Sequence, residues 1–355
     1  MARPPFPPSP HPGQHPMARP MLSDEARATV EEALRAHVAP NARLTGISRL
    51  SGGACQQNLL LTLADGNGDP LPPHVLRADA ATSLPMSLRR RQEEPVMRAA
   101  AAAGVPTPAP LALLESVPRP GRDAVLMPWV EGEAVGARII ASDSLAEARK
   151  DLPEALARAL ARIHSVTPDD HPELLPNAAD DPVDVAMNGL RVLTEGLCAM
   201  RPALSLAVRW LEDHLPADRT PVLVHGDFRV GNFLVSPRGL EAVLDWEFAH
   251  WGAAGEDLGW IMVRDWRFSR PELPVGGLCG RETFLRAWEN HAGRTIDRAD
   301  VRFWEVYGNV RWAAGCHFQT MRVLAGGERN LELLAISRRA VEMEVEALRL
   351  IDRAT

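Results

Sequence analysis

The stretch VLVHGDFRVGNFLV, residues 222–235, begins as an apolar strand and then runs straight into His225, Gly226 and Asp227. Asn232 follows five residues beyond the aspartate. A strand that ends in polar residues usually does no more than reach the protein surface. The residues that follow this stretch decide whether the pattern marks a functional site.

The chain continues from Asn232 as NFLVSPRGLEAVLDWE, which predicts two short strands joined by a turn at SPRG. In such a hairpin Asn232 lies opposite Val243 or Leu244, and Asp245 lies beside it at the open end. Asp227 reaches the same point on the loop that precedes the hairpin. The hairpin is therefore expected to bring three oxygen-bearing side chains together.

These three side chains suit one kind of chemistry. Mg²⁺ prefers hard oxygen ligands and commonly takes one or two from the protein, with phosphates and waters completing its shell. The amide oxygen of Asn232 and the carboxylate of Asp245 fit that role. The carboxylate of Asp227, held off the metal, can accept the proton of an attacking hydroxyl group. His225 and Gly226 would shape the loop.

The bulk composition is that of a globular protein. Of the 355 residues, 46% are hydrophobic and 24% are charged, and the net charge is −7, so nucleic acid is not an expected partner. No uninterrupted apolar run is long enough to span a membrane, and the Pro-rich start lacks the apolar core of a signal peptide. The four cysteines are far apart without metal-ligand spacing, which favours reduced thiols and a cytoplasmic location.

The pattern of apolar residues divides the chain into two unlike parts. Residues 24–38 have helical spacing, and residues 40–130 contain several short strands and one helix. After the linker PWVEGEAVG the chain is largely helical, apart from the strands within 220–247. We therefore predict an α+β fold with a cleft between its lobes as the natural ligand site. The predicted units are a disordered tail over 1–22, a small β-rich lobe over 23–130 and a larger, mainly helical lobe over 131–355.

HGDFRVGN followed by LDWE resembles the catalytic and metal-binding segments of the aminoglycoside phosphotransferase-like kinases, closest to the branch associated with acyl-CoA dehydrogenases. The similarity covers roughly residues 40–330. It implies a bilobal protein-kinase-like fold, with nucleotide bound by the N-terminal lobe and the acceptor by the C-terminal lobe. By this resemblance Asp227 is the catalytic base, Asn232 and Asp245 are Mg²⁺ ligands, and His225 supports the loop. In the downstream GEDLGW, Asp257 would be structural.

The resemblance also implies a nucleotide site. The segment LSGGACQQN looks like the loop that covers the nucleotide, with Gly52 and Gly53 letting the backbone approach phosphate. The family places a cation on the third strand, paired with a helix glutamate. Lys150, the only lysine of the chain, lies outside this region, so Arg77 and Glu93 are the candidates. The alternative is that Arg77 is a surface strand residue and Glu93 a solvated helix charge.

Other candidate residues have weaker support. The segment LMPWVEGEAV matches the position of the adenine-binding linker of the family. Arg311 lies on a predicted helix near the expected acceptor pocket and is a possible acceptor-binding residue. His164 is expected to pack at a helix end, and His250 to belong to a loop.

We expect an ATP-dependent phosphotransferase that uses Mg²⁺ and acts on a hydroxyl group of a small molecule. The alternative is a nucleotide-binding regulator without catalysis, which the missing lysine favours. A metal-dependent hydrolase using His225 and Asp227 is a third possibility, although such a site ordinarily has more ligands nearby. The acceptor stays open among hydroxy acids or hydroxyacyl groups, antibiotics, sugars and choline-like alcohols, as do ATP against GTP and the oligomeric state. The mixed charge of the last helices does not favour antibiotic resistance.

Overall fold

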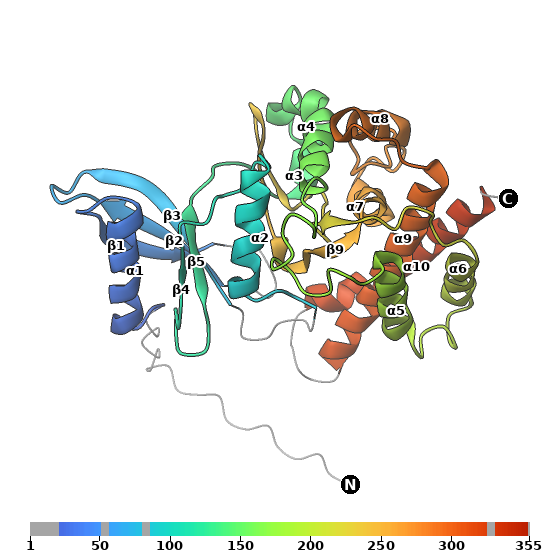
Figure 1. The fold of residues 1–355 in the computed structure, drawn as a ribbon, viewed down its shortest axis with the longest axis horizontal. Coiled ribbons are helices and arrows are strands. Elements are labelled where there is room, and N and C mark those ends of the chain that lie inside the picture. The colour runs from blue at the N-terminus through green and yellow to red at the C-terminus, as the bar shows by residue number, and fades with distance from the viewer. Residues whose placement is uncertain (1–20, 51–56, 80–85, 325–330, 354–355) are drawn as a thin grey trace, which may run out of the picture.

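The structure, a computed structural model, describes residues 21–50, 57–79, 86–324 and 331–353. Most of the predicted Pro-rich tail lies outside these residues. Leu22, the last residue of that tail, is buried in the core of the N-terminal lobe. Figure 1 shows a sheet with helix α1 at one end of the molecule and the remaining helices massed at the other. Helix α2 stands between these two parts.

The N-terminal lobe is built on a five-stranded antiparallel sheet in the order β1-β2-β3-β5-β4. Along β2, Leu59, Leu61 and Leu63 alternate with less buried residues, so one face of the sheet is apolar. Helix α1 covers this face with Val30 and Leu34. The elements are α1 (Asp24–His37), β1 (Arg43–Arg49), β2 (Gln57–Ala64), β3 (Pro70–Ala78), α2 (Arg90–Ala102), β4 (Ala112–Leu114) and β5 (Ala124–Pro128).

The C-terminal lobe is mainly helical and contains two small two-stranded sheets, β6 with β9 and β7 with β8. Among the described residues, no helix is both long and apolar enough to cross a membrane. Its helices are α3 (Gly136–Ala141), α4 (Ala148–Ile163), α5 (Pro182–Thr194), α6 (Pro202–Asp213), α7 (Ala254–Trp260), α8 (Arg281–Ala292), α9 (Arg298–Leu324) and α10 (Leu331–Asp352). Its strands are β6 (Pro221–Val224), β7 (Phe233–Ser236), β8 (Gly239–Val243) and β9 (His250–Ala253), and its 3₁₀ turns are η1 (Asp143–Leu145), η2 (Trp246–Phe248) and η3 (Arg264–Arg267).

The two lobes are joined by more than the linker. The backbones of Glu133 and Val235 exchange hydrogen bonds of 2.8 and 3.0 Å, which attach the linker to strand β7. The Thr107 hydroxyl donates to the carbonyl of Val243 at 3.0 Å and accepts from the indole N–H of Trp246 at 3.1 Å. The hairpin that carries the predicted site is therefore held from the N-terminal side as well.

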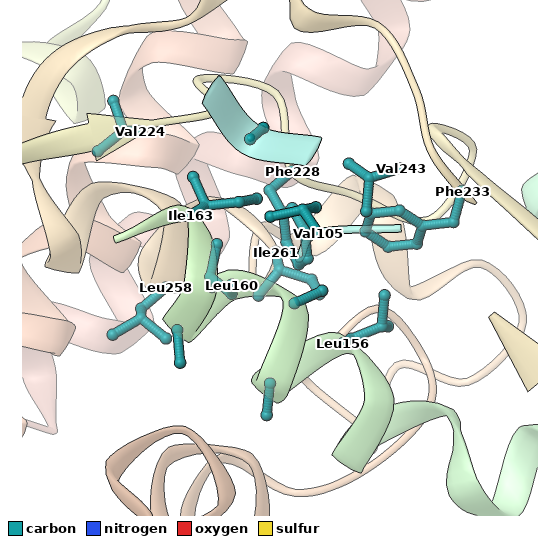
Figure 2. Packing of buried hydrophobic residues seen from close by; sticks show 14 of the residues in the cluster. Val105, Leu156, Leu160, Ile163, Val224, Phe228, Phe233, Val243, Leu258 and Ile261 are labelled. Carbon is teal, nitrogen blue, oxygen red and sulfur yellow. The ribbon is translucent and has the colours of Figure 1, made fainter. Parts of the chain in front are cut away.

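A continuous apolar core surrounds the hairpin. Figure 2 shows Phe228 of the loop among side chains of α4, including Leu160 and Ile163, with Phe233 and Val243 of the hairpin close by. Phe228, Phe233 and Val243 have no exposed surface. Phe228 and Phe233 directly follow Asp227 and Asn232 in the chain, so their burial constrains the direction of these two polar side chains.

The sequence patterns missed β9 and α7, over residues 250–260. Every residue of α7 is buried, including Glu256 and Asp257, so this helix has no solvent-exposed face and no amphipathic pattern to detect. Gly255 and Gly259 let α7 lie directly against α9. A Cβ atom on Gly259 would lie 2.4 Å from the backbone carbon of Trp304, and one on Gly255 would lie 2.2 Å from its indole ring.

This close approach gives a testable difference between two helical glycines. We expect Gly259→Ala to lower the free energy of unfolding by about 1–3 kcal/mol, because the added methyl group must push α7 and α9 apart. Gly189→Ala in α5 is the matched control, since a Cβ there meets no atom within 4 Å. It should stabilise the protein by up to about 1 kcal/mol. Urea unfolding of both variants measures this, and equal effects would contradict the packing argument.

Candidate active site

The β7–β8 hairpin has the register that the sequence predicts. Phe233 pairs with Val243, and Ser236 pairs with Gly239 across the turn. The N–H of Leu244 donates to the carbonyl of Asn232 at 2.8 Å, so Asn232 lies opposite Leu244, one of the two predicted positions. Asp245 follows at the open end of the hairpin in a left-handed conformation, with φ 70°.

Asn232 is tied directly to Asp227. Its amide nitrogen donates to the backbone carbonyl of Asp227 at 2.9 Å and to its carboxylate oxygen Oδ2 at 2.6 Å. Two acceptors around one atom identify that atom as the nitrogen. The amide oxygen is therefore the atom that Asn232 can offer to a cation.

Asp227 receives two further donors that the sequence analysis missed. The indole N–H of Trp260, at the end of α7, donates to Oδ1 at 2.8 Å. The Nε of Arg229 lies 3.0 Å from Oδ1 and 3.2 Å from Oδ2. The Asp227 side chain is consequently fixed in orientation and 11% exposed. Arg229 belongs to the HGDFRVGN motif, but the motif does not tell where its side chain points.

His225 links the loop to Leu244, the residue before Asp245. Its Nδ1 accepts the N–H of Asp227 at 3.2 Å, so the neutral ring carries its proton on Nε2, which donates to the carbonyl of Leu244 at 3.0 Å. Both ring nitrogens are thus occupied by backbone groups. We infer that His225 positions Asp227 and the residue before Asp245, as a loop-supporting role requires, and exchanges no proton with a substrate.

Asp257 anchors this loop from α7. Its buried carboxylate accepts the N–H groups of His225 at 2.7 Å and Gly226 at 3.0 Å. His164 lies 3.4 Å away on the far side and accepts the indole N–H of Trp288. Burial opposes ionisation of Asp257, but these partners outweigh it and lower its pKa. Burial lowers the pKa of His164 despite the neighbouring carboxylate.

Gly226 occupies a place that no other residue fills without strain. Its φ is 77°, and a Cβ atom would lie 2.2 Å from the carbonyl oxygen of Phe248. The loop can therefore pass close to η2, which begins directly after Asp245.

Arg77 and Glu93 meet beside Asp245. The Nη2 atom of Arg77 lies 3.1 Å from Glu93 and 2.5 Å from Asp245. Arg77 is 8% exposed and Glu93 is fully buried, so the alternative that both are solvated surface charges is wrong. Burial alone would lower the pKa of Arg77, but the two carboxylates raise it. The cation is thus permanently charged and sits between helix α2 and the hairpin.

Arg90, one turn before Glu93, is a second buried cation that the sequence analysis missed. It contacts the other oxygen of Glu93, and lies 3.6 Å from Asp79 and 3.9 Å from Glu247. Its spacing of three residues from Glu93 on a helix was the available signal. Gly52 and Gly53, the predicted phosphate-loop residues, lie outside the described residues.

Arg311 is connected to Asp227 through Trp260. Its guanidinium stacks 4.7 Å above the ring of Trp260 and donates to Glu256 at 3.2 Å. Glu256 also lies 3.1 Å from His250. These three charged residues line a pocket of about 260 Å³. The walls of that pocket are mostly apolar and come from α5, β9 and neighbouring residues, among them Leu175, Leu190, Leu193, Phe248 and Trp251.

The donor set fits Mg²⁺ held jointly with phosphates. Within the described part of the chain, no group of three or more His, Cys, Asp or Glu residues could hold a metal ion. One amide oxygen and one carboxylate suffice for Mg²⁺ when phosphates supply further oxygens. A hydrolase with its own metal cluster has no support in this geometry.

Comparisons with known proteins agree with this arrangement. A model of the phosphotransferase enzyme family matches residues 46–304. Acyl-CoA dehydrogenase family member 10 of Mus musculus is 31% identical over 195 residues, which are 51% of this chain and 17% of that protein. Acyl-CoA dehydrogenase family member 11 of Rattus norvegicus is 30% identical over 198 residues, 54% of this chain and 25% of that protein. The match thus spans a quarter or less of these two relatives.

Solved structures share the fold over nearly the whole chain. A Ralstonia eutropha protein described as an aminoglycoside phosphotransferase covers 92% of this chain and 98% of its own, with a TM-score of 0.71 and 23% identity. Spectinomycin phosphotransferase in complex with ADP and spectinomycin covers 90% and 98%, with a TM-score of 0.58 and 13% identity. Choline kinase from Cryptosporidium parvum covers 92% and 95%, with a TM-score of 0.55 and 11% identity. The predicted bilobal, protein-kinase-like α+β fold is confirmed.

The anchor of the loop can be tested through stability. We expect Asp257→Asn to lower the free energy of unfolding by about 1–3 kcal/mol, because the new amide nitrogen cannot accept an N–H bond and leaves a buried donor unpaired. Asp213→Asn, at an exposed pair with Arg209, is the control and should change stability by less than about 0.5 kcal/mol. Chemical denaturation of both variants measures this. A neutral Asp257→Asn would show that the loop is held by other contacts.

His250 should make stability depend on pH. Burial alone would lower its pKa, but Glu256 outweighs burial and the opposing charge of Arg311, and raises it. A raised folded-state pKa stabilises the protein below the unfolded value, and this contribution is lost as pH rises through the folded value. The difference in unfolding free energy between the native chain and His250→Gln should therefore shrink as the pH rises above the unfolded-state pKa of about 6.5. A constant difference would mean that His250 does not change charge in this range.

Proposed function

Because the chain belongs to the phosphotransferase enzyme family, we propose that it is a small-molecule kinase that moves the γ-phosphoryl group of ATP to a hydroxyl group. The observation that supports this proposal is the hydrogen bonding of Asn232 to Asp227 at the end of the hairpin that Asp245 follows. The amide nitrogen of Asn232 is committed to Asp227, which leaves its oxygen for a cation, and Asp245 comes directly after Leu244, the residue opposite Asn232. The ADP in the spectinomycin phosphotransferase structure supports nucleotide as the donor.

Asp227 is the proposed base. An acceptor hydroxyl would donate its hydrogen bond to this carboxylate, whose direction is set by Trp260 and Asn232. Phosphoryl transfer needs little covalent chemistry from the protein, so positioning and charge stabilisation dominate. Asn232 and Asp245 would hold Mg²⁺, which when bound neutralises charge on the phosphates.

Arg77 is the proposed phosphate-binding cation in place of lysine. It lies between Glu93 and Asp245, where a cation can be turned from one acid to the incoming phosphates. Gly52 and Gly53 stay proposed contacts of the phosphates. The linker over 126–135, which pairs with β7 at Glu133, stays the proposed contact of the adenine edge.

The pocket lined by Arg311 is the proposed acceptor site. Arg311 stacks on Trp260, and Trp260 donates to Asp227. A single side chain, that of Trp260, therefore separates this pocket residue from the proposed base. Its mixture of apolar walls and buried charge suits a small alcohol with both polar and apolar parts.

A nucleotide-binding regulator is the second candidate. The missing lysine favoured it, but Arg77 supplies a buried, permanently charged cation in that position. A regulator also has no need of a base held by Trp260 and Asn232. The arrangement therefore favours the kinase.

Replacing the base separates these two functions. We expect Asp227→Ala to lower kcat by about a hundredfold or more, because the hydroxyl loses its proton acceptor. Nucleotide should still bind, since Asn232 and Asp245 are unchanged. The acceptor is first found by a screen of pooled metabolites for ATP consumption, and binding is followed by thermal shift with Mg²⁺.

Asp245→Ala is the matched variant, in which Mg²⁺-dependent nucleotide binding should weaken. Full turnover by Asp227→Ala would remove Asp227 from the mechanism. Nucleotide binding by the native chain without turnover of any acceptor would favour the regulator.

A further inference from the structure

Resting on the proposed function, the geometry points to a specific role for Arg229. We propose that its guanidinium binds the non-bridging oxygens of the phosphoryl group during transfer. This would make Arg229 a catalytic residue in its own right, beside the base that it contacts in the structure.

Arg229 lies against Asp227 and keeps N–H groups for a further ligand. All of its hydrogen bonds among the described residues run through Nε, to the two oxygens of Asp227. The side chain is 27% exposed, so its two terminal nitrogens are accessible. The guanidinium lies 4.6 Å from the ring centre of Trp266, which supports its face. Gly231 leaves room for it, since a Cβ there would lie 2.7 Å from Nη1.

The reaction requires a cation at this point. An attacking hydroxyl bonded to Asp227 brings the phosphoryl group close to that carboxylate, so two negative groups must approach each other. Arg229 already neutralises the carboxylate, and its terminal nitrogens extend from the same plane. A planar guanidinium can therefore bond both groups at once, which a point charge does less well.

Arg77 and Arg311, the other arginines proposed to bind a ligand, are committed elsewhere. Arg77 is held by Glu93 and Asp245 on the metal side. Arg311 is held by Glu256 and stacks on Trp260. Among the described residues that contact the carboxylate of Asp227, Arg229 is the one that carries a positive charge.

Arg229 takes no part in the covalent bonds that form and break during transfer. The acceptor oxygen forms a bond to the γ-phosphorus, and the bond from that phosphorus to the bridging oxygen breaks with its electron pair leaving on ADP. The hydroxyl proton passes to Asp227. Arg229 neither gains nor loses a proton, and only stabilises charge on the oxygens that are transferred.

The test compares two nucleotides that differ in the γ-phosphoryl group. Isothermal titration in Mg²⁺ gives the Kd of ADP and of the β,γ-imido analogue of ATP, without any acceptor. The native chain should prefer the analogue, and Arg229→Gln should reduce this preference by roughly tenfold or more while ADP affinity stays the same. Arg229→Lys should lose part of the preference and serves as the second variant if Arg229→Gln folds poorly.

Arg264→Gln is the matched control. Arg264 lies in the segment of Trp266, is 25% exposed and lies 3.9 Å from Glu342, so its loss should leave the preference unchanged. An Asp227→Asn background removes the charge of the base. If Arg229 contacts the phosphoryl group directly, Arg229→Gln must reduce the preference in that background too.

Three results would refute the inference. These are an unchanged preference in Arg229→Gln, an effect that disappears in the Asp227→Asn background, and a native chain that binds both nucleotides equally. A native chain that binds no nucleotide at all would instead refute the proposed function.

Discussion

The site depends on one buried carboxylate that holds backbone rather than substrate. Asp257 accepts the N–H groups of both His225 and Gly226. Because Asp257 is buried, losing these bonds would leave buried donors unpaired and lower the free energy of unfolding. The same α7 helix ends in Trp260, whose indole fixes the direction of Asp227. One short helix therefore sets both the path of the loop and the orientation of its carboxylate. The glycines of α7 matter for the same reason, because they let the helix lie close enough to α9 to keep this position.

The acids of the candidate site are paired with arginines. Asp245 is paired with Arg77 and Asp227 with Arg229, and Glu93 is shared by Arg77 and Arg90. Buried carboxylates without such partners would carry a large desolvation cost. The pairing places a guanidinium group beside each of these acids. A single lysine in the chain is no obstacle to this design, because guanidinium groups stay charged when buried and can contact two acids at once.

The sequence predicted what is decided by local rules. The turn at SPRG set the register of the hairpin, and with it the place of Asn232 and Asp245. Apolar runs between turn segments predicted the short strands of the N-terminal lobe, and the absence of a lysine in that lobe pointed to Arg77. Other features depend on residues that are distant in the chain. Trp260 reaches Asp227 only because α7, which has no solvent-exposed face, packs into the core beside the loop. Arg229 was visible in the motif, but its contact with Trp266 comes from tertiary packing that spacing alone does not encode.

The segment that contains Asp245 and Glu247 is attached to the N-terminal lobe at two points. The N–H of Leu88, just before α2, donates to the carbonyl of Glu247 at 2.7 Å, and Arg77 joins Asp245 from the same lobe. Separating the lobes must strain or break these links. The spacing of the two lobes and the pairing of Asp245 with Arg77 are therefore coupled. By linkage, a ligand that favours one spacing of the lobes would also change the strength of that pairing.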